Sequence, residues 1–569
     1  MIMGRLHSQV SGSTILLNQV GFFPGGQKVA VIRSADATEF LVRSVNTGQV
    51  VLKAKLSEPR KSVFSGSLTR IADFSDVTAP GKYVISVPEV GDSYEFEIKK
   101  AVFDELTASL IKGYYFQRMS TDLPPEFAGK WSRKGGHPDR QVIIHPAAAS
   151  SGRPAGTVIS SPRGWYDAGD YNKYIVNSGI TMGTLLSAYE EFPEYYSALR
   201  IKIPESGNGA PDLLNESVWN LRWMLTMQDP GDGGVYNKVT NANFDGMVMP
   251  VECNTPRYVV PKGTAATLDF AAVMAQAARV FKGFAKVYPG LSDSCLASAQ
   301  KAWTWAKKNP NVPYDQNLMN KNYQPVIVTG GYGDNNFTDE FIWAASELYV
   351  TTGKNEYYSA QNMIPDDQMT LPSWNNVKLL GYYTLARFEK NLSGTAKKDI
   401  TAIKQMLLNS ADKLAEGIGT SAYQTVMGRS AADFVWGSNS VAANEGVLLI
   451  EAYRISGNKK YLGLALGNLD YLLGRNATGY SFVTGYGHKS PMFPHHRLSE
   501  ADGIADPIPG LLVGGPNPGQ QDGCKTYPSS LPDESYTDTV CSYASNEIAI
   551  NWNAPAVYLA GALDALYVK

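Results

Sequence analysis

Two carboxylates lie three positions apart in GWYDAGDYNKY, residues 164–174. In such a glycine- and aromatic-rich segment, Asp167 and Asp170 could face one site. One carboxylate would then hold a water molecule and remove its proton, while the other orients that water. The alternative is a simple turn, because Asp and Gly are frequent in turns for backbone reasons alone. Both interpretations of this segment taken alone stay open.

A second segment, SFVTGYGHKSPMFPHHRLS at residues 481–499, gathers hydrogen-bond donors on a loop rich in Gly and Pro. His495, His496 and Arg497 suit a ligand rich in hydroxyl groups, or a carboxylate. A surface loop with satisfied side chains is an equal alternative. A zinc site would need more nitrogen or sulfur ligands than this loop offers, so we do not expect one here.

The third segment is YTDTVCSYASNEIAINWNAP, residues 536–555. Glu547 follows an Asn and precedes an apolar helix, and Tyr536, Tyr543 and Trp552 lie near it in sequence. Partial desolvation there would raise the pKa of the Glu547 carboxyl and keep it protonated, as a general acid requires. The alternative is a glutamate at a helix start that is favoured by the helix dipole.

Taken together, a carboxylate pair and a distant glutamate in an aromatic setting match glycoside hydrolysis. An inverting glycosidase uses one carboxylate as base and one carboxylic acid as acid. The two groups lie about 6.5–9.5 Å apart so that water fits between the base and the sugar.

The elements that must position these residues have two different periods. Up to about residue 100, short β-branched runs are separated by Gly, Pro or Asn, and Tyr83, Ile85 and Val87 alternate with polar residues. This pattern predicts a small β-sandwich. The predicted strands are 14–20, 29–32, 40–45, 50–52 and 82–87, with a further alternation at Tyr94, Phe96 and Ile98.

From residue 101 onward the apolar residues follow a helical period. Patterns begin at Phe103, Leu214, Leu268 and Leu462, and further ones cover 341–351, 377–388, 401–416, 440–456 and 555–567. We expect roughly ten to twelve helices with no strong strand between them, and an α/α barrel fits this pattern. No flexible linker separates the two regions, so we expect them to pack together.

Composition excludes several classes. The 569 residues include 51 basic and 53 acidic side chains, which give a net charge of −2 and no basic footprint for nucleic acid. No apolar run reaches the length of a membrane span. Residues 1–13 lack the apolar stretch of a signal peptide. We expect this segment to be disordered or foreign to the native chain, and the location to be cytoplasmic, or secreted or periplasmic after signal removal. Among four cysteines, Cys524 and Cys541 are near enough in sequence to bridge, and that question stays open.

Several long motifs, in order, resemble glycoside hydrolase family 9, the inverting β-1,4-glucanases often called cellulases. The motifs are LNQVGFFP (17–24), YDAGDYNKY (166–174), TDEFIWAASELYVTTGKNEYY (338–358), WGSNSVAANEGVLLIEAYRISGNKKYL (436–462), YLLGRNATGYSFVTGYGHKSPMFPHHR (471–497) and PGLLVGGPN (509–517). The spacing of Tyr536, Asp538, Tyr543, Glu547 and Asn553 resembles the segment that carries the acid in that family.

The resemblance implies a small all-β immunoglobulin-like domain over 14–100 and an all-α (α/α)6 barrel over 101–569. By position, Asp170 is the expected general base, Asp167 its partner in holding water, and Glu547 the general acid. The substrate-binding residues that the resemblance implies are His495, Arg497, Asp538 and Tyr543. Support of Glu547 or its loop is the alternative role for Asp538.

The resemblance also bears on metals. It implies no cofactor for the chemistry and a structural calcium near Asp339 and Glu340, with a third ligand from SWNN (373–376). Relatives with the same N-terminal domain often carry a zinc site of Cys and His just before the base loop. Here His137 and His145 are present but no cysteine lies between Ala101 and Asp170, so we do not expect that site.

The expected activity is hydrolysis of β-1,4 bonds in glucans or cello-oligosaccharides, by an endoglucanase or a cellodextrinase. The alternative is an exo-β-D-glucosaminidase that acts on chitosan oligosaccharides. The partner is an oligo- or polysaccharide, with no nucleic acid and no membrane, and the oligomeric state is left open.

Overall fold

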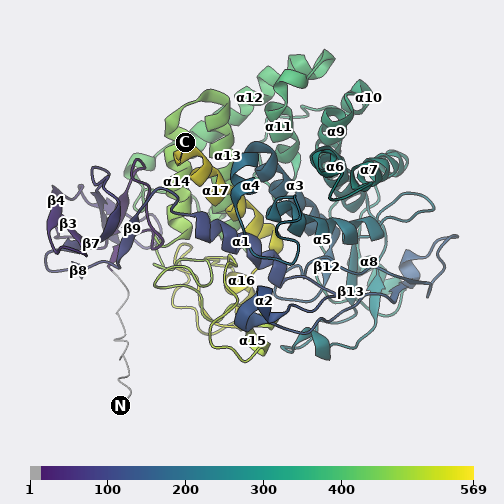
Figure 1. The fold of residues 1–569 in the computed structure, drawn as a ribbon, viewed down its shortest axis with the longest axis horizontal. Helices are drawn as coiled ribbons and strands as arrows, with labels where there is room; N and C mark the ends of the chain where they lie inside the picture. Colours follow the sequence, from purple (N-terminus) through teal and green to yellow (C-terminus); the bar gives the residue numbers. More distant parts are fainter. Residues whose placement is uncertain (1–13, 569) are drawn as a thin grey trace.

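The computed structural model describes residues 14–568 and consists of a small β-unit beside a much larger helical unit (Figure 1). The predicted disordered or foreign segment 1–13 lies outside the described residues. Between residues 14 and 568, no helix combines the length and the apolar character that crossing a bilayer requires.

The β-unit is a sandwich of two antiparallel sheets. The first has the order β1–β2–β6–β5, with bounds Ile15–Leu16, Val29–Ile32, Leu68–Asp73 and Arg60–Lys61. The second has the order β4–β3–β7–β8, with bounds Val50–Lys55, Glu39–Ser44, Gly81–Val87 and Gly91–Asp92, and β9 (Phe96–Ile98) also pairs with β7. Phe22, Phe74 and Phe96 pack between the sheets with ring centroids 5.1–5.3 Å apart. The predicted strands are confirmed except that the one expected over 14–20 is limited to Ile15–Leu16, whereas β5, β6 and β8 were not predicted.

Eleven α-helices of ten or more residues dominate the described part of the second unit, in agreement with the expected number. They are α1 (Asp104–Phe116), α3 (Ile175–Glu191), α5 (Asp212–Thr226), α6 (Thr264–Phe281), α7 (Leu291–Lys308), α9 (Thr338–Thr352), α11 (Lys378–Arg387), α12 (Gly394–Ala415), α13 (Ser438–Ser456), α14 (Lys459–Leu472) and α17 (Ile550–Tyr567). The short helices are α2 (Pro125–Ala128), α4 (Pro193–Ala198), α8 (Gln316–Asn322), α10 (Asn355–Ser359), α15 (Arg497–Ala501) and α16 (Tyr543–Asn546).

Within residues 14–568 no long strand interrupts the helices, as expected, but a small sheet of short strands was not predicted. A five-stranded sheet of order β11–β10–β14–β13–β12 lies within the helical unit. Its strands are Val158–Ile159, Val142–Ile144, Arg257–Val259, Lys238–Asn241 and Lys173–Tyr174. Each has two to four residues, which is too short to give a periodic signal in sequence. The sheet matters for function because β12 directly follows the segment that contains Asp170.

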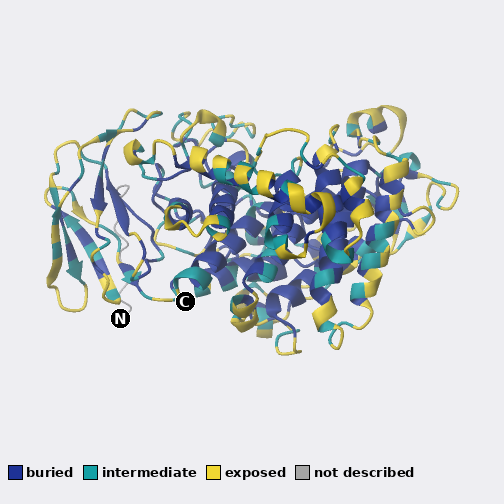
Figure 2. Ribbon diagram, turned by 90° about the horizontal axis from the view of Figure 1, so that it is seen from above, coloured by how far each residue is buried: buried dark blue, intermediate teal, exposed yellow. Residues whose placement is uncertain are grey.

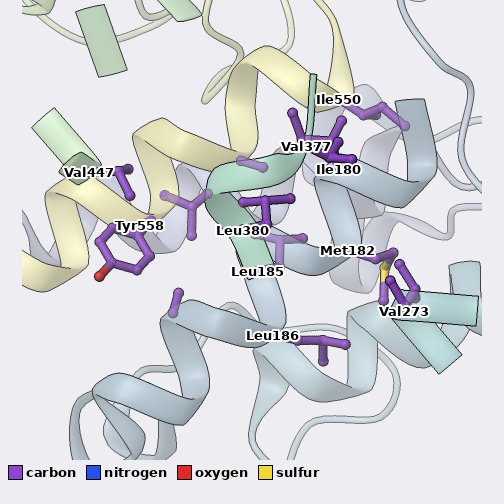
Figure 3. Close-up of a cluster of buried hydrophobic side chains, with 14 of the residues drawn as sticks. Ile180, Met182, Leu185, Leu186, Val273, Val377, Leu380, Val447, Ile550 and Tyr558 are labelled. Atoms are coloured by element: carbon purple, nitrogen blue, oxygen red, sulfur yellow. The ribbon is translucent and has the colours of Figure 1, made fainter. Parts of the chain in front are cut away.

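Six helices form the buried centre of the helical unit: α3, α6, α9, α11, α13 and α17. Along this set, α17 packs on α3, α3 on α6, α6 on α9, α9 on α11 and α13 on α17. The remaining long helices lie outside them, with α1 against α17, α5 against α3, α7 against α6, and α12 and α14 against α13. Figure 2 shows the central helices almost wholly buried and the peripheral ones exposed on one side. Leu185, Val273, Leu380, Val447 and Tyr558 meet in the shared core (Figure 3).

A buried network of charged side chains joins the central helices, mostly near their C-terminal ends. Arg387 of α11 bonds to Glu190 at 2.9 Å and to Glu191, both at the end of α3. Arg279 of α6 donates to Glu190 at 2.7 Å and to Glu347 of α9 at 2.8 Å. The helices α13 and α17 join through Arg454, whose Nε lies 3.2 Å from Glu191, and through the Tyr558 hydroxyl, which donates to Glu191.

The two units pack directly on each other, as expected from the missing linker. The amide of Asn18 donates to Asp470 of α14 across 2.8 Å, in a buried position. Phe23 stacks on Tyr567 of α17 with ring centroids 4.6 Å apart and meets Phe103 edge-on at 5.1 Å. Aromatic contacts with Phe103, just before α1, and with α17, together with a buried polar pair on α14, thus fix the sandwich to the larger unit.

Candidate active site

The predicted base and acid segments converge immediately before the first residues of α3 and α17. Ala168 forms an antiparallel bridge with Ala549. The amide of Ile550 donates to the carbonyl oxygen of Asp167 at 2.8 Å, and the amide of Gly169 donates to Oε1 of Glu547 at 3.3 Å. Contacts between the two segments therefore set the position of Glu547 relative to Asp167 and Asp170.

Glycine is required at position 169 because a side chain would not fit there, and not because the backbone has an unusual conformation. A Cβ atom at this position would lie 2.1 Å from the carbonyl oxygen of His495. The carbonyl oxygen of Gly169 accepts from the amide of Arg497 at 3.2 Å and from its guanidinium at 2.8 Å. The base loop, the histidine loop and the acid segment thus meet at one residue without a side chain.

Asp167 is buried beneath the site with 1% of its surface exposed. Its Oδ2 accepts from Asn177 of α3 at 2.8 Å and from the hydroxyl of Tyr332 at 3.4 Å. Burial, followed by the negative charge of Asp170, raises the pKa of the Asp167 carboxyl well above its usual range.

Asp170 is held on one side only. Its Oδ2 accepts from Asn172 at 2.5 Å and from the hydroxyl of Tyr174 at 3.1 Å. Both of these bonds within residues 14–568 use the same oxygen, so Oδ1 is the atom that can receive a proton from a water molecule. This arrangement is suited to the base role predicted for Asp170.

Glu547 has the electrostatic setting of an acid. Burial raises the pKa of the Glu547 carboxyl well above its usual range, the nearby charge of Asp170 raises it further, and the cation of Arg497 opposes both effects. A glutamate whose pKa is raised, beside an aspartate that accepts protons, is the combination required for acid–base hydrolysis of a glycoside.

His495 and Arg497 come together with Tyr543 beside the carboxyls, as predicted. Nδ1 of His495 donates to the carbonyl oxygen of Val540 at 2.6 Å, which leaves Nε2 of the neutral ring as an acceptor for a sugar hydroxyl. The rings of His495 and Tyr543 lie 5.8 Å apart. Arg497 is fixed by its bonds to Gly169 and by donation to the carbonyl oxygen of Asp245 at 2.9 Å.

The neighbouring His496 has a different environment. It is 1% exposed, and its Nε2 and Nδ1 lie 2.9 Å from the Gln117 side-chain oxygen and from the Ser499 hydroxyl respectively. Burial lowers the pKa of His496 to about 3, so the ring stays neutral. His496 therefore anchors the loop, and His495 is the histidine that can reach substrate.

Asp538 holds the loops in place. Its two oxygens accept from the amides of Met492 and Phe493 at 2.8 and 2.9 Å, and Oδ1 also accepts from Asn546 at 3.1 Å. Asn546 directly precedes Glu547. Of the two roles expected for Asp538, these contacts favour support of the acid segment over direct contact with sugar.

Cys524 and Cys541 form a disulfide, which settles the question left open by their spacing. Cys541 lies six residues before Glu547 in the chain, so the bridge restrains the segment that leads to the acid.

Sequence reasoning missed four residues that shape the carboxyl pair: Asn172, Tyr174, Asn177 and Tyr332. Asn172 and Tyr174 lie inside the motif already recognised. Tyr332 stands in TGGYG (329–333), where glycines around an aromatic were a usable signal. Its ring packs on Tyr174 at 4.8 Å and on Trp374 at 5.3 Å, which fixes the hydroxyl near Asp167.

Exposed aromatic rings extend from the site on two sides. Trp436 is 43% exposed and lies 5.3 Å from the Tyr543 ring. Phe244 is 47% exposed and lies 5.8 Å from the Arg497 guanidinium. Phe493, in the histidine loop, is 57% exposed. Apolar rings that remain open to solvent beside polar groups are suited to stacking on sugar rings.

The carboxyl oxygens of the residues expected to hold calcium differ in whether they have a hydrogen-bond partner. Asp339 and Glu340 are 5% and 1% exposed. Oδ2 of Asp339 accepts from the Val377 amide at 2.7 Å, whereas both carboxyl oxygens of Glu340 and Oδ1 of Asn376 are buried without a hydrogen-bond partner. Burial and then the charges of Asp339, Asp269 and Asp334 raise the pKa of Glu340 well above its usual range. Such an uncompensated group of oxygens fits a hard cation.

Comparison with known proteins identifies the family. Residues 103–560 match the profile of Glycosyl hydrolase family 9, and residues 10–92 match that of the Cellulase N-terminal ig-like domain. The chain is 49% identical to a xyloglucan-specific endo-beta-1,4-glucanase of Bacteroides ovatus, covering 99% of this chain and 95% of the relative. It is 34% identical to Endoglucanase D of Acetivibrio thermocellus, covering 96% and 83% respectively.

A solved structure agrees with the sequence matches. A family 9 glycoside hydrolase from Bacteroides ovatus superposes with a TM-score of 0.94 at 48% identity, covering 98% of this chain and 100% of the other. Profile, sequence and structure thus converge on one assignment: the chain belongs to glycosyl hydrolase family 9.

Proposed function

We propose that this glycoside hydrolase is an inverting endo-β-1,4-glucanase whose preferred substrate is xyloglucan. The observation that carries the catalytic part is the link between the base loop and the acid segment. Asp170 has a free carboxyl oxygen, and Glu547, bonded to the same loop through Gly169, has a raised pKa.

In the proposed reaction, Asp170 removes a proton from a water molecule. The oxygen of that water attacks the anomeric carbon from the face opposite the leaving group. Glu547 donates its proton to the glycosidic oxygen as that bond breaks. Asp167 orients the water, and His495 and Arg497 bind hydroxyls of the sugar beside the scissile bond. The attack occurs in a single displacement, so the new reducing end has the α configuration.

The choice of xyloglucan rests on the Bacteroides ovatus relative, because a 49% identical protein named as xyloglucan-specific covers nearly the whole chain. The exposed rings of Trp436, Phe244 and Phe493 offer stacking surface beside the carboxyls. No observation favours the alternative exo-β-D-glucosaminidase. Asp538, an acidic group in the histidine and acid region, is already engaged by backbone amides.

We propose in addition that the helical unit is an (α/α)6 barrel. Along the chain, peripheral and central helices alternate from α1 and α3 to α14 and α17, with α10 as the short peripheral member. The buried network around Glu190, Glu191 and Arg387 connects side chains of all six central helices. In this arrangement the carboxyls lie before the starts of the central helices, and the charged network lies at the opposite ends.

We further propose a structural calcium between the start of α9 and Asn376. Glu340, Asp339 and the amide oxygen of Asn376 would hold it, and the cation would compensate their buried negative charge. Removal of calcium by chelation is expected to lower the thermal midpoint, and Glu340→Gln should abolish that effect. An equal midpoint with and without chelator in the unmodified protein would refute the site.

A substrate panel tests the proposed activity. The protein should release oligosaccharides from xyloglucan faster than from undecorated β-1,4-glucan, with products of several lengths from the start. Asp170→Asn should lose this activity by orders of magnitude. Release of single glucosamine units from chitosan hexamer, with no cleavage of either glucan, would transfer the function to the glucosaminidase alternative.

A further inference from the structure

We propose that His137, Asp245 and Cys253 form a zinc site, distinct from the catalytic carboxyls and from the proposed calcium site. One ring nitrogen of His137, a carboxylate oxygen of Asp245 and Sγ of Cys253 all lie within 4.8 Å of one another. Among residues 14–568, this is the one group of at least three His, Cys, Asp or Glu side chains that meets that condition.

The closest pair of these atoms already has the spacing of zinc ligands. Nε2 of His137 and Oδ2 of Asp245 are 3.5 Å apart. Ligands at about 2.0–2.2 Å from a tetrahedral zinc are separated by roughly 3.4 Å. His137 is 4% exposed, and both facing atoms are buried without a hydrogen-bond partner. Two unsatisfied polar atoms directed at each other in a buried position are costly unless a bound group compensates them.

The other nitrogen of His137 is oriented as a metal-ligating histidine requires. Nδ1 lies 3.1 Å from the hydroxyl of Tyr166. A proton on Nδ1 donated to the Tyr166 oxygen leaves the lone pair on Nε2, toward Asp245 and Cys253. Support of this kind from a second partner fixes the tautomer and the ring orientation of histidine ligands.

Packing holds the two halves of the site together. A Cβ atom at Gly136 would lie 2.2 Å from the carbonyl oxygen of Pro250, so the His137 segment touches the turn Pro250–Glu252 directly. Cys253 is the residue after that turn. The ligand from one segment and the thiol from the other therefore meet because a glycine permits close backbone contact.

The donor set selects zinc among the common cations. Nitrogen, sulfur and one carboxylate oxygen suit a borderline-soft divalent ion, whereas calcium and magnesium prefer oxygen alone. The thiol of Cys253 loses its proton to solvent on binding, and the thiolate and the Asp245 carboxylate then balance the two positive charges. Arg257 is nearby, but its guanidinium pairs with Asp139, 3.1 Å away. Three protein ligands leave the fourth position to water.

The site lies close enough to the active site to affect it. The carbonyl oxygen of Asp245 accepts from Nε of Arg497 at 2.9 Å, and Phe244 carries one of the exposed rings beside that guanidinium. Zinc bound to Asp245 and Cys253 would fix the segment that positions both residues. A more rigid segment is expected to lower KM more than it changes kcat.

Cobalt titration of the whole protein, with calcium in excess, tests the site by its spectrum rather than by activity. Co²⁺ should bind at one equivalent per chain and give a thiolate-to-cobalt charge-transfer band, and Zn²⁺ should displace it. Cys253→Ser should abolish the band, and Asp245→Asn should weaken Co²⁺ and Zn²⁺ binding at least tenfold. Cys295→Ser is the matched control, because Cys295 is the other free thiol of the described chain and is buried in α7.

The absence of a charge-transfer band in the unmodified protein would overturn the proposal, as would a band that persists in Cys253→Ser. Far-ultraviolet circular dichroism of each variant shows whether the fold is retained. If Cys253→Ser does not fold, blocking of Cys253 by alkylation in the presence and absence of Zn²⁺ decides the question. Protection of this thiol by zinc is expected, and equal modification rates would refute the site.

Discussion

The backbone amide of Gly169 donates a hydrogen bond to Oε1 of Glu547 across 3.3 Å. Asp170, the proposed base, is the next residue, so one peptide segment carries the base and contacts the acid. The backbone of the base loop therefore restrains where the Glu547 carboxyl lies relative to Asp170. An inverting reaction depends on the separation of these two groups because a water molecule must fit between base and sugar.

The role of Glu547 can be tested by removing its proton. Glu547→Gln should reduce kcat on xyloglucan by roughly 100- to 10,000-fold, the usual contribution of a general acid, with little change in binding. An aryl glycoside with a good leaving group needs less protonation, so the same variant should lose much less activity on it. Equal losses on both substrates, measured by initial rates, would argue against the acid assignment.

Gly169→Ala tests the geometric link. The added Cβ would meet the carbonyl oxygen of His495 at 2.1 Å and force the base loop away from the histidine loop, which itself pairs with the acid segment through His495 and Glu547. A displacement of about 1 Å in an active site costs on the order of 100-fold in rate. Gly283→Ala is the control, because no atom lies within 4 Å of a Cβ at that position. If both variants kept unmodified kcat/KM, the proposed constraint would be absent.

Replacement of two charged neighbours of Glu547 should shift the alkaline limb of the pH profile in opposite directions. Loss of the Glu547 proton sets the alkaline limb of kcat/KM. Arg497 lowers the pKa of Glu547, so Arg497→Met should shift that limb to higher pH. Asp167 raises the same pKa, so Asp167→Asn should shift the limb to lower pH. Shifts of the same sign in both variants would show that another group controls the alkaline limb.

The buried network at the far ends of the central helices should matter for stability. Arg387→Met removes the cation that bonds to Glu190 and Glu191 and leaves buried carboxylates undercompensated. The free energy of unfolding should fall by about 3–5 kcal/mol. Lys404→Met removes a more exposed ion pair with Glu389 and should change that free energy by less than about 0.5 kcal/mol. Similar denaturation midpoints for the two variants would contradict the role of the network.

Much of this architecture could be predicted from sequence because periodicity reports helices with one apolar face. The helices α1, α5, α6, α9, α11, α12, α13, α14 and α17 follow such patterns. Helix α3 was missed because it is buried on nearly every side and therefore lacks a polar face. Helix α7 was missed although its buried residues Leu291, Cys295, Ala299, Ala302 and Ala306 recur at helical spacing.

Site residues that lie inside a recognisable motif could be predicted from the sequence. Site residues that reach the site only through contacts between distant segments could not. Asp167, Asp170 and Glu547 stand in recognisable segments. Tyr332 reaches Asp167 from a loop 165 positions away, and Asp245 reaches Arg497 from 252 positions away. Contacts between distant segments leave no spacing signal in a single sequence. The short strands that position the base loop escaped for a related reason, since two residues cannot show a period.

The most direct test of the central claim is the anomeric configuration of the first product. Proton NMR during the early hydrolysis of cellohexaose or a xyloglucan oligosaccharide records which anomer appears before mutarotation. We predict that the α-anomer forms first, because Asp170 activates water for a single displacement while Glu547 protonates the leaving oxygen. Initial appearance of the β-anomer would indicate a covalent intermediate and would contradict the assignment of Asp170 and Glu547 as base and acid.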